Sequence, residues 1–560
     1  MKPKDQKGKR LDRRQFMKQA ATMSTTVAAV SLLSGPLTPA PVKADSSVPE
    51  KWDEETDVVV VGTGVAGYGA AIEVKDAGAD VMIIEKEPRY GGNSVLAGGA
   101  MQFPANHIQK AAGIEDRPEW AFEDIMNMGE HRNAPELVRL FVENAADTAL
   151  WLEKLGIVWN KQPIKQEGCR VARTLVPAPS RDYPLARGLS EIFVLHRAAS
   201  EARGIPIRLG CTMTRIVRSE AKGPVVGIEV IADGKTINIK AKKAVVLATG
   251  GFKANHRMIR ALDPRLDEPF PWSGFPYVHT VGDGHFAAAA VGAGFVDMSF
   301  VCEFAFTIGS SRYVVWDPPA MDSPIGSGGL PFGAKGQPYM ILVNNDGNRY
   351  VNEGTFGTSH AIWKSEHTAA YLNLPKRPRI AWMVVDSEGA KSLAWTTTLF
   401  QNADPKKAPY LDPKLVAMGE TIGALAGKME IPASNLEATL KKYKASVEAG
   451  ADKEFGRPAP LYALTTAPFF GARLILNTHD QCAGIRVNSK MQVIDQTFQA
   501  EGGTRPSVSL DEERVIPHLY AAGECTGGLY GADRGPGKFG SYLVQGRFAG
   551  RHAAAERPAG

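Results

Sequence analysis

The clearest pattern of apolar positions lies between residues 56 and 85. Four consecutive valines, Val58 to Val61, form an apolar run typical of a strand in a buried parallel sheet. An Ala-rich segment with helical spacing follows from Tyr68 to Gly78, and a second apolar run, Asp80 to Ile84, ends at Glu85. The order of strand, helix and strand predicts a βαβ unit.

Glycines occupy the turn between the first strand and the helix, in the sequence Gly62-Thr63-Gly64-Val65-Ala66-Gly67. Gly62 allows a tight turn, Gly64 lets a pyrophosphate approach the backbone, and Gly67 lets the helix pack closely on the strand. Free N–H groups at the helix N-terminus then face the phosphates. Because Glu85 can accept hydrogen bonds from ribose hydroxyls and repels a 2′-phosphate, the unit predicts a dinucleotide site that disfavours NADP. Glycines that merely fill a structural turn are the alternative.

The same patterns outline the rest of the chain. Helices are expected at residues 118–156, 189–202, 286–291 and 542–555, with two more within 412–450. Strands are expected in a meander at 205–240 with a hairpin turn at Asp233-Gly234, in a hairpin at 339–353, and at 244–251 and 519–522. The glycine turn that ends strand 244–251 should place Thr249 and Gly250 beside the cofactor. Asp283 either caps helix 286–291 or faces the cofactor.

The composition is that of an ordinary globular protein, with 44% hydrophobic and 22% charged residues among 560. A chain of this length can form two or three domains with a large core. The formal net charge is +5, but residues 1–44 hold nine Lys or Arg and two Asp. The remaining 56 basic and 58 acidic side chains nearly balance, so no nucleic-acid-binding surface is predicted.

Residues 1–44 have the features of an export signal. The run Arg13-Arg14-Gln15-Phe16-Met17-Lys18 is similar to the twin-arginine consensus, an apolar stretch follows from Ala20 to Leu33, and Val42-Lys43-Ala44 fits a cleavage site. The apolar stretch is too short and too rich in Thr and Ser to span a membrane permanently. We therefore expect twin-arginine export to the periplasm, a route that carries folded proteins with their cofactor. A basic disordered tail is the alternative.

The cysteine spacing bears on electron transfer. The chain has five cysteines, Cys169, Cys211, Cys302, Cys482 and Cys525, without any C-x-x-C or C-x-x-C-H spacing. No haem attachment, zinc pair or iron–sulfur cluster is therefore predicted, and no metal site is expected. Buried thiols are the simplest interpretation. Electrons must then come from a bound organic cofactor and an outside carrier.

Taken together, the motifs resemble the fumarate reductase/succinate dehydrogenase flavoprotein superfamily. Within it, the chain is most similar to the flavocytochrome c fumarate reductases and the 3-ketosteroid Δ1-dehydrogenases, over about residues 53–556. Besides the glycine fingerprint with Glu85, the resemblance rests on Gly91-Gly92-Asn93-Ser94, Ala97-Gly98-Gly99, Ala248-Thr249-Gly250-Gly251, Gly282-Asp283-Gly284, Asn352-Glu353, Ala522-Gly523-Glu524 and Gly546-Arg547-Phe548-Ala549-Gly550.

The resemblance implies an α/β fold, in which a Rossmann-like FAD-binding domain is split in sequence and an α+β capping domain is inserted. The expected divisions are a signal at 1–44, FAD-binding parts at 45–300 and 470–560, and the cap at 301–469. The substrate is expected between cap and flavin, where closure excludes water. Because no histidine lies between Arg89 and His107, the FAD is expected to be noncovalent. The residues expected to bind it are Gly62, Gly64, Ala66, Gly67, Glu85, Lys86, Gly92, Asn93, Ser94, Gly98, Gly99, Met213, Thr249, Gly250, Asp283, Gly523, Glu524, Gly540, Ser541 and Tyr542.

The active site departs from both relatives. The arginine that donates a proton in fumarate reductases is replaced by Gly357, and the family's His-Pro-Thr motif is absent near Val301. Gly535-Pro536-Gly537 resembles the ketosteroid dehydrogenases, but Asp533 stands where those enzymes carry a catalytic tyrosine.

Four residues remain as catalytic candidates. Arg534 matches the family's carboxylate-binding arginine, and its guanidinium suits a bidentate grip. Tyr530, His479 and Asp480 are candidate acids. Each acid also has a structural alternative: Tyr530 can simply pack, His479 can cap a turn, and Asp480 can pair with Arg473.

Three functions fit these residues. The first is a periplasmic reductase of an activated C=C bond in an α,β-unsaturated acid or enone. It uses hydride from flavin N5, an acid, and electrons from a separate cytochrome c or quinol-linked donor. The missing arginine disfavours fumarate itself as substrate. The second function is desaturation of a ketone such as a steroid, which the Gly-Pro-Gly run and an aromatic cap loop favour. The third is a flavin electron-transfer subunit of a cytochrome complex.

Overall fold

The computed structural model describes residues 48–96, 99–166, 168–178, 189–266, 279–298, 304–308, 337–355, 369–401, 414–478, 481–497, 509–531 and 537–559. All of them belong to one compact unit, Pro39–Gly560. The expected signal at 1–44 lies outside the described residues, as do His479, Asp480 and Arg534. Those predictions stay predictions.

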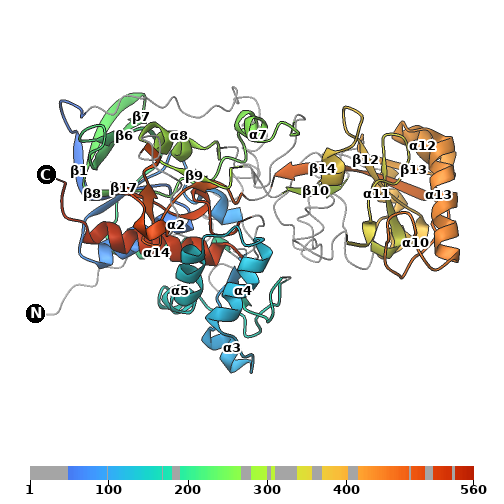
Figure 1. Cartoon of the computed structure of the whole chain (residues 1–560), viewed down its shortest axis with the longest axis horizontal. Helices are drawn as coiled ribbons and strands as arrows, with labels where there is room; N and C mark the ends of the chain where they lie inside the picture. Colours follow the sequence, from blue (N-terminus) through green and yellow to red (C-terminus); the bar gives the residue numbers. More distant parts are fainter. Residues whose placement is uncertain are drawn as a thin grey trace, which may run out of the picture. The chain divides into compact units, whose positions relative to one another are not determined.

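The larger sheet is built around β1 (Glu54–Val61), which is labelled at the left of Figure 1 and has a parallel neighbour on each side. Val58–Val61 pairs in register with Val81–Ile84 of β2 and with Ala244–Leu247 of β8. The central position explains the four valines, which are almost completely buried. The sheet order is β16-β17-β8-β1-β2-β5, and β6 and β7 extend it from β8. The other bounds are β2 (Val81–Ile84), β5 (Ile207–Arg208), β6 (Cys211–Arg218), β7 (Val225–Ala232), β8 (Lys235–Leu247), β16 (Gln492–Ile494) and β17 (Val515–Ala521).

Helix α14 (Phe539–Ala555) packs against α2 (Val65–Asp76) through glycines (Figure 1). A Cβ atom on Gly546 would lie 2.3 Å from the carbonyl oxygen of Ala66, and one on Gly550 would lie 2.3 Å from that of Ala70. Both distances are shorter than any real Cβ contact. The Gly546-to-Gly550 motif therefore lets two helix backbones touch, which holds the last helix against the first nucleotide-binding turn.

A second sheet is antiparallel throughout and has its own core. Its order is β10-β14-β12-β11, with β13 also paired to β14. The strands are β10 (Phe304–Ile308), β11 (Met340–Asn344), β12 (Ala381–Val385), β13 (Val416–Gly419) and β14 (Phe469–Thr478). These strands all come from residues between the two segments that build the larger sheet. The exact domain boundaries stay a prediction.

Short strands and helices complete the described residues. The strands are β3 (Met101–Gln102), β4 (Thr174–Leu175), β9 (Phe295–Val296) and β15 (Gly484–Ile485). The α-helices are α3 (His107–Ala111), α4 (Pro118–Met128), α5 (Pro135–Lys154), α6 (Leu189–Ala202), α7 (His256–Leu262), α8 (Asp283–Ala290), α10 (Ser387–Ser392), α11 (Thr397–Gln401), α12 (Ile422–Met429) and α13 (Ala433–Glu448). The 3₁₀ turns are η1 (Gly92–Leu96), η3 (Gln337–Tyr339), η4 (Glu353–Thr355), η6 (Leu510–Glu512) and η7 (Gly523–Cys525).

Several expected elements differ from the structure. The helix expected at 118–156 is two helices, because the chain turns between Gly129 and Ala134 and α5 begins with a proline. The strand expected at 244–251 is the second half of the long strand β8, whose first half forms the predicted hairpin with β7 at Asp233-Gly234. The closing helix begins at Phe539, before the expected Tyr542.

The hairpin expected at 339–353 forms only at its turn, where the Asn344 N–H donates to the Asn348 carbonyl oxygen at 2.9 Å. Strand β11 pairs with β12, and only Arg349 bridges back to Val343. Beyond Arg349 the buried Glu353 carboxylate binds the Arg349 guanidinium and accepts the Leu342 N–H. A buried ion pair and one side-chain hydrogen bond to β11 thus stand where the second strand was expected.

Candidate FAD-binding site

The glycine turn after β1 forms a cradle of bare backbone. Gly62 has a φ of +111°, and a Cβ there would lie 2.3 Å from the Ala248 carbonyl oxygen. A Cβ on Gly67 would lie 2.0 Å from the Gly62 carbonyl oxygen. Gly64, by contrast, has an ordinary extended backbone and would meet only the Ser94 Oγ, at 3.3 Å. Two glycines therefore close the turn against backbone atoms, whereas the third presents bare backbone at the N-terminus of α2, where an anion is favoured.

The Glu85 carboxylate lies at the end of β2 and holds this turn. Its Oε2 accepts hydrogen bonds from the Thr63 N–H at 3.1 Å and from Thr63 Oγ1 at 2.6 Å, and its Oε1 accepts from the Glu87 N–H at 3.0 Å. Thr63 Oγ1 in turn accepts the Gly91 N–H at 2.8 Å. These bonds fix the carboxylate beside the glycine cradle; the expected contact with a ribose stays a prediction.

The segment Gly92-Asn93-Ser94 crosses the beginning of α2. The Val65 N–H donates to Ser94 Oγ at 3.2 Å, which places this segment at the helix N-terminus. The side-chain amide of Asn93 is buried, and neither its Oδ1 nor its Nδ2 has a hydrogen-bond partner in the structure. A buried amide without partners is costly. It therefore indicates a polar ligand at this position; the expected contact of Asn93 with FAD stays a prediction.

Lys86 and Asp283 meet at the beginning of α8. The Lys86 ammonium forms an ion pair with the Asp283 carboxylate and donates to the carbonyl oxygen of His279. The N-cap of α8 is Gly282, so Asp283 does not cap the helix, and that alternative is wrong. Next to this pair, burial raises the pKa of Glu87 to about 7. Whether Lys86 and Asp283 also contact the cofactor stays a prediction.

The carboxyl ends of β8 and β17 form another side of the site. After β8, Gly250 has a φ of +68°, and a Cβ on Gly284 would lie 2.1 Å from Thr249 Oγ1. After β17, the Gly523 N–H donates to Gln545 Oε1 of α14 at 2.8 Å. In open parallel sheets, ligands bind outside the carboxyl ends of the strands. Met213, the remaining candidate from this part of the chain, is buried on β6.

The N-terminus of α14 is tightly enclosed. A Cβ on Gly540 would lie 2.4 Å from the Gln102 carbonyl oxygen. Ser541 Oγ donates to the Lys538 carbonyl oxygen at 2.7 Å and accepts the Tyr530 hydroxyl at 2.8 Å. Of the four catalytic candidates, only Tyr530 lies in the described residues, where it is buried. Its hydroxyl is thus engaged with the helix that begins at this site.

Sequence reasoning missed three residues at the site, namely Gln481, Cys482 and Lys538. Gln481 Oε1 accepts the Phe252 N–H at 2.6 Å, and its Nε2 lies 3.5 Å from the Glu524 carbonyl oxygen. The Lys538 ammonium is buried and lies 3.2 Å from the Gln481 carbonyl oxygen and 3.5 Å from Cys482 Sγ. A lysine within a run of small residues at a helix start was the available signal. Its partners are 56 and 57 positions away, so no local pattern reveals the cluster.

FAD fits the groups that this chain presents. The open backbone at Gly64 suits a pyrophosphate, and the buried Asn93 amide needs a polar partner. Gly62 and Gly67 allow the backbone contacts that close the turn beside this position. These features define a dinucleotide-binding α/β protein of the split Rossmann type.

Comparison with known proteins identifies the dinucleotide. Residues 57–539 match the family described as FAD binding domain, and the chain belongs to this family. It is therefore an FAD-dependent oxidoreductase. The match includes both segments of the larger sheet and the second sheet between them.

Similar proteins are reductases and dehydrogenases. The chain is 30% identical to the urocanate reductase of Eggerthella lenta over 519 residues, covering 92% of this chain and 77% of that one. It is 30% identical to a fumarate reductase (cytochrome) of Shewanella frigidimarina, covering 90% and 77%. Its structure resembles the open conformation of a flavocytochrome c3 fumarate reductase, with a TM-score of 0.70, 26% identity and coverage of 98% and 82%. A 3-ketosteroid-Δ4-(5α)-dehydrogenase from Rhodococcus jostii shares the fold, with a TM-score of 0.65, 24% identity and coverage of 92% and 100%.

Two features are absent from the residues that the structure describes, a membrane-spanning helix and a cluster of metal ligands. None of the helices there is long and apolar enough to cross a membrane. Likewise, within the part of the chain that the structure describes, no three His, Cys, Asp or Glu side chains are placed to hold a metal ion.

Proposed function

We propose that this protein is a periplasmic FAD-dependent oxidoreductase acting on CH–CH bonds, and that it reduces an activated C=C bond in an α,β-unsaturated acid or enone. The observation that carries the proposal is the junction at Gln481. This residue follows β14 of the second sheet, and its side chain binds the loop after β8 and lies beside the turn after β17. Gln481 therefore joins the FAD site within three residues of the end of β14, so a substrate bound next to the second sheet can lie beside the flavin. The names of the relatives, urocanate reductase and fumarate reductase, support the same reaction class.

The chain's own residues have distinct tasks in this reaction. When bound, FAD supplies the hydride that adds to the β-carbon of the alkene. Arg534 grips the carboxylate or carbonyl of the substrate as negative charge develops there. The N–H groups at the beginning of α14 add a positive potential at the enclosed site. The second sheet and its loops exclude water from the reacting atoms.

The electron donor and location belong to the same proposal. The printed sequence has no C-x-x-C-H spacing for haem, so we propose a separate cytochrome c or quinol-linked donor. The twin-arginine-like run at residues 13–18 supports export to the periplasm.

A second candidate is ketone desaturation of the Δ1-dehydrogenase type. The Gly535-Pro536-Gly537 run favours it, and the shared fold with a ketosteroid dehydrogenase is compatible with it. The Asp533 substitution argues against it, because it removes the tyrosine that those enzymes use.

A substrate panel tests the proposal. The holoenzyme is reduced with dithionite or a viologen and mixed anaerobically with unsaturated acids, enones and steroids, while flavin reoxidation is followed. Reoxidation by an unsaturated acid or enone supports the proposed function. Reoxidation by none of them contradicts it, and reduction of the oxidised flavin by a saturated ketosteroid supports the second candidate.

Arg534 provides a more specific test. Arg534→Ala should raise the KM for a carboxylate substrate by at least about 100-fold, because loss of a charge-assisted hydrogen-bonded pair costs several kcal/mol. The flavin content serves as the control and should not change. A KM equal to that of the wild type would show that Arg534 does not hold the substrate.

A further inference from the structure

We propose that Lys538 is the acid that protonates the α-carbon in this reduction, in place of the family's arginine, whose position Gly357 occupies. The proposal rests on the proposed function. It begins from one side chain: the Lys538 ammonium is almost completely removed from solvent, with 3% of the residue exposed. A buried lysine is unusual, and its charge must be compensated or used.

The backbone around Lys538 fixes the side chain at the site. Lys538 is the N-cap residue of α14 and forms an antiparallel bridge with Met101. The Gln102 N–H donates to the Gly537 carbonyl oxygen at 3.2 Å. The ammonium therefore projects from a point where strand β3 and the start of α14 are held together.

The partners of the ammonium place it beside the cofactor cradle. Its Nζ donates to the carbonyl oxygen of Gln481, whose side chain binds the Phe252 N–H directly after the glycine turn of β8. A Cβ on Gly251 would lie 2.2 Å from that side chain, so the two segments are in direct contact. Since ligands bind at the carboxyl ends of such strands, the ammonium lies at the edge where the flavin and substrate are expected.

Two other acids lie in the same cluster. Cys482 Sγ is 3.5 Å from the ammonium, and the centre of the Tyr530 ring is 5.2 Å from it. The Tyr530 hydroxyl, however, donates to Ser541 Oγ on the helix. Among the three groups, only the ammonium combines a proton that it can donate with a positive charge that attracts the developing carbanion.

The step is balanced with the reduced flavin as the only reductant. Hydride adds to the β-carbon, and the π electron pair of the alkene moves to the α-carbon and its carbonyl or carboxylate. An N–H bond of the Lys538 ammonium then breaks, and a C–H bond forms at the α-carbon. The resulting neutral amine takes a proton from solvent before the next turnover.

The test separates alkene reduction from electron transfer. Holoenzyme reduced with dithionite is mixed in a stopped-flow instrument either with the best alkene of the substrate panel or with ferricyanide, which requires no proton transfer to carbon. Lys538→Met is expected to slow flavin reoxidation by the alkene by at least about 100-fold, the usual contribution of general acid catalysis. Its reoxidation by ferricyanide should stay within about twofold of the wild type.

Lys243→Met is the matched control. Lys243 Nζ donates to the Ala554 carbonyl oxygen at 2.9 Å, so it binds the opposite end of the same helix. Both of its reoxidation rates should equal those of the wild type. In addition, methylammonium should restore alkene reduction in Lys538→Ala, and the fall of the wild-type rate at high pH should be absent from Lys538→Met.

Three results would overturn the proposal. One is an unchanged alkene rate in Lys538→Met, and another is an equal slowing of the alkene and ferricyanide reactions, which would indicate only a structural role. The third is a loss in Cys482→Ala as large as that in Lys538→Met, which would assign the proton to the thiol. If wild-type enzyme reacts with ferricyanide but with no alkene, the proposed function itself fails, and the role of Lys538 falls with it. FAD affinity, measured by flavin fluorescence, should be the same in all variants that fold.

Discussion

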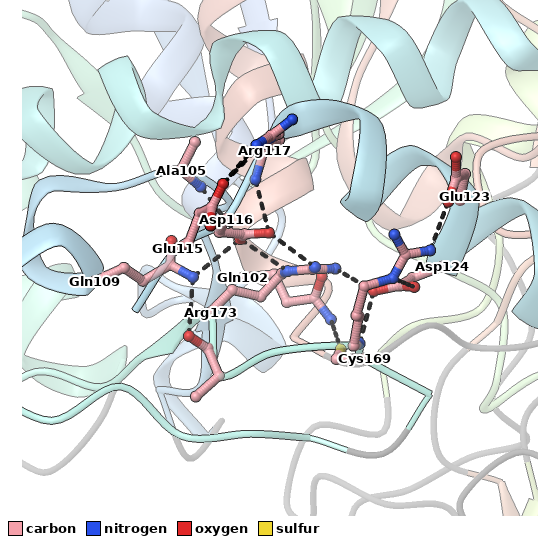
Figure 2. Close-up of polar contacts among 12 residues, drawn as sticks. Gln102, Ala105, Gln109, Glu115, Asp116, Arg117, Glu123, Asp124, Cys169 and Arg173 are labelled. Carbon is pink, nitrogen blue, oxygen red and sulfur yellow. Dashed lines mark hydrogen bonds and ion pairs between the residues drawn. The ribbon is translucent and has the colours of Figure 1, made fainter. Parts of the chain in front are cut away.

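Replacing Arg173 should destabilise the protein more than any surface change of the same kind. Its guanidinium is completely buried and binds two carboxylates (Figure 2). Nε and Nη2 lie 3.0 Å from the two oxygens of Asp116, and Nη1 lies 2.7 Å from Asp124 Oδ2. The Arg173→Met variant keeps the apolar stem but leaves both acids without the guanidinium that neutralises them.

The magnitude follows from burial. The Asp116 side chain is 0% exposed and that of Asp124 is 8% exposed, so water cannot replace the lost partner. Removing one member of a buried ion pair typically costs about 3–5 kcal/mol. The same cluster contains a matched control, the Arg117–Glu115 pair, whose side chains are 60% and 66% exposed. Exposed pairs contribute about 1 kcal/mol or less, so Arg117→Met should change little.

Thermal unfolding followed by circular dichroism measures both variants. We expect Arg173→Met to lower the midpoint by roughly 3–5 °C and Arg117→Met by about 1 °C or less, because a chain of this length has a large unfolding entropy. The same region contains Gln102, whose side-chain amide donates to Cys169 Sγ and whose backbone N–H donates to the Gly537 carbonyl oxygen at the FAD site. Arg173→Met should therefore lose flavin as well. Equal midpoints for the two arginine variants would refute the assignment of the stabilisation to buried charge.

Three further predictions concern packing, pH and the cofactor linkage. Gly546→Leu should prevent assembly of α14 on α2 and give colourless, aggregating protein, and a flavin-loaded Gly546→Leu variant would contradict the packing. At Gly427 in helix α12, by contrast, an added Cβ would have no neighbour within 4 Å. Gly427→Ala should therefore stabilise the protein by about 0.5–1 kcal/mol in thermal unfolding. Burial raises the pKa of Asp297 to about 6 although the Gly528 N–H binds it, so this acid contributes stability below about pH 4 that is lost as pH rises through 6. Asp297→Asn should therefore gain stability relative to the wild type over that range, and a pH-independent difference in melting midpoint would show that Asp297 does not titrate there. Acid precipitation should release all yellow colour to the supernatant, because the FAD is expected to be noncovalent; a yellow pellet would contradict this.

The nucleotide-binding core was predictable because its signals are local. The valines of β1, the glycines after it and the acid at the end of β2 follow one another within 30 residues, and their roles follow from backbone geometry alone. The structure confirms this order of strand, helix and strand, with β1 in the centre of the sheet. The two-sided burial of β1 is what makes its run of valines informative.

Other features depend on partners far apart in the sequence. Strand β11 pairs with Ala381–Val385 of β12 and not with the segment that follows it, so the partner of β11 could not be read from the local pattern. The contact of Gly546 with Ala66 joins helices 480 positions apart, so the glycine motif could be noticed but its physical reason could not. Lys538 was missed for the same reason, since its surroundings are assembled only by folding.

The most direct test of the account is FAD binding by Gly64→Val. Gly64 has an ordinary backbone conformation, and a Cβ there would meet only the side-chain oxygen of Ser94, at 3.3 Å, so the variant should fold with a melting midpoint within a few degrees of that of wild-type apoprotein. Its side chain would occupy the place expected for the pyrophosphate, so fluorescence titration should show FAD affinity weakened by at least about 100-fold. A folded Gly64→Val variant that binds FAD as tightly as the wild type would contradict the placement of the cofactor in this cradle.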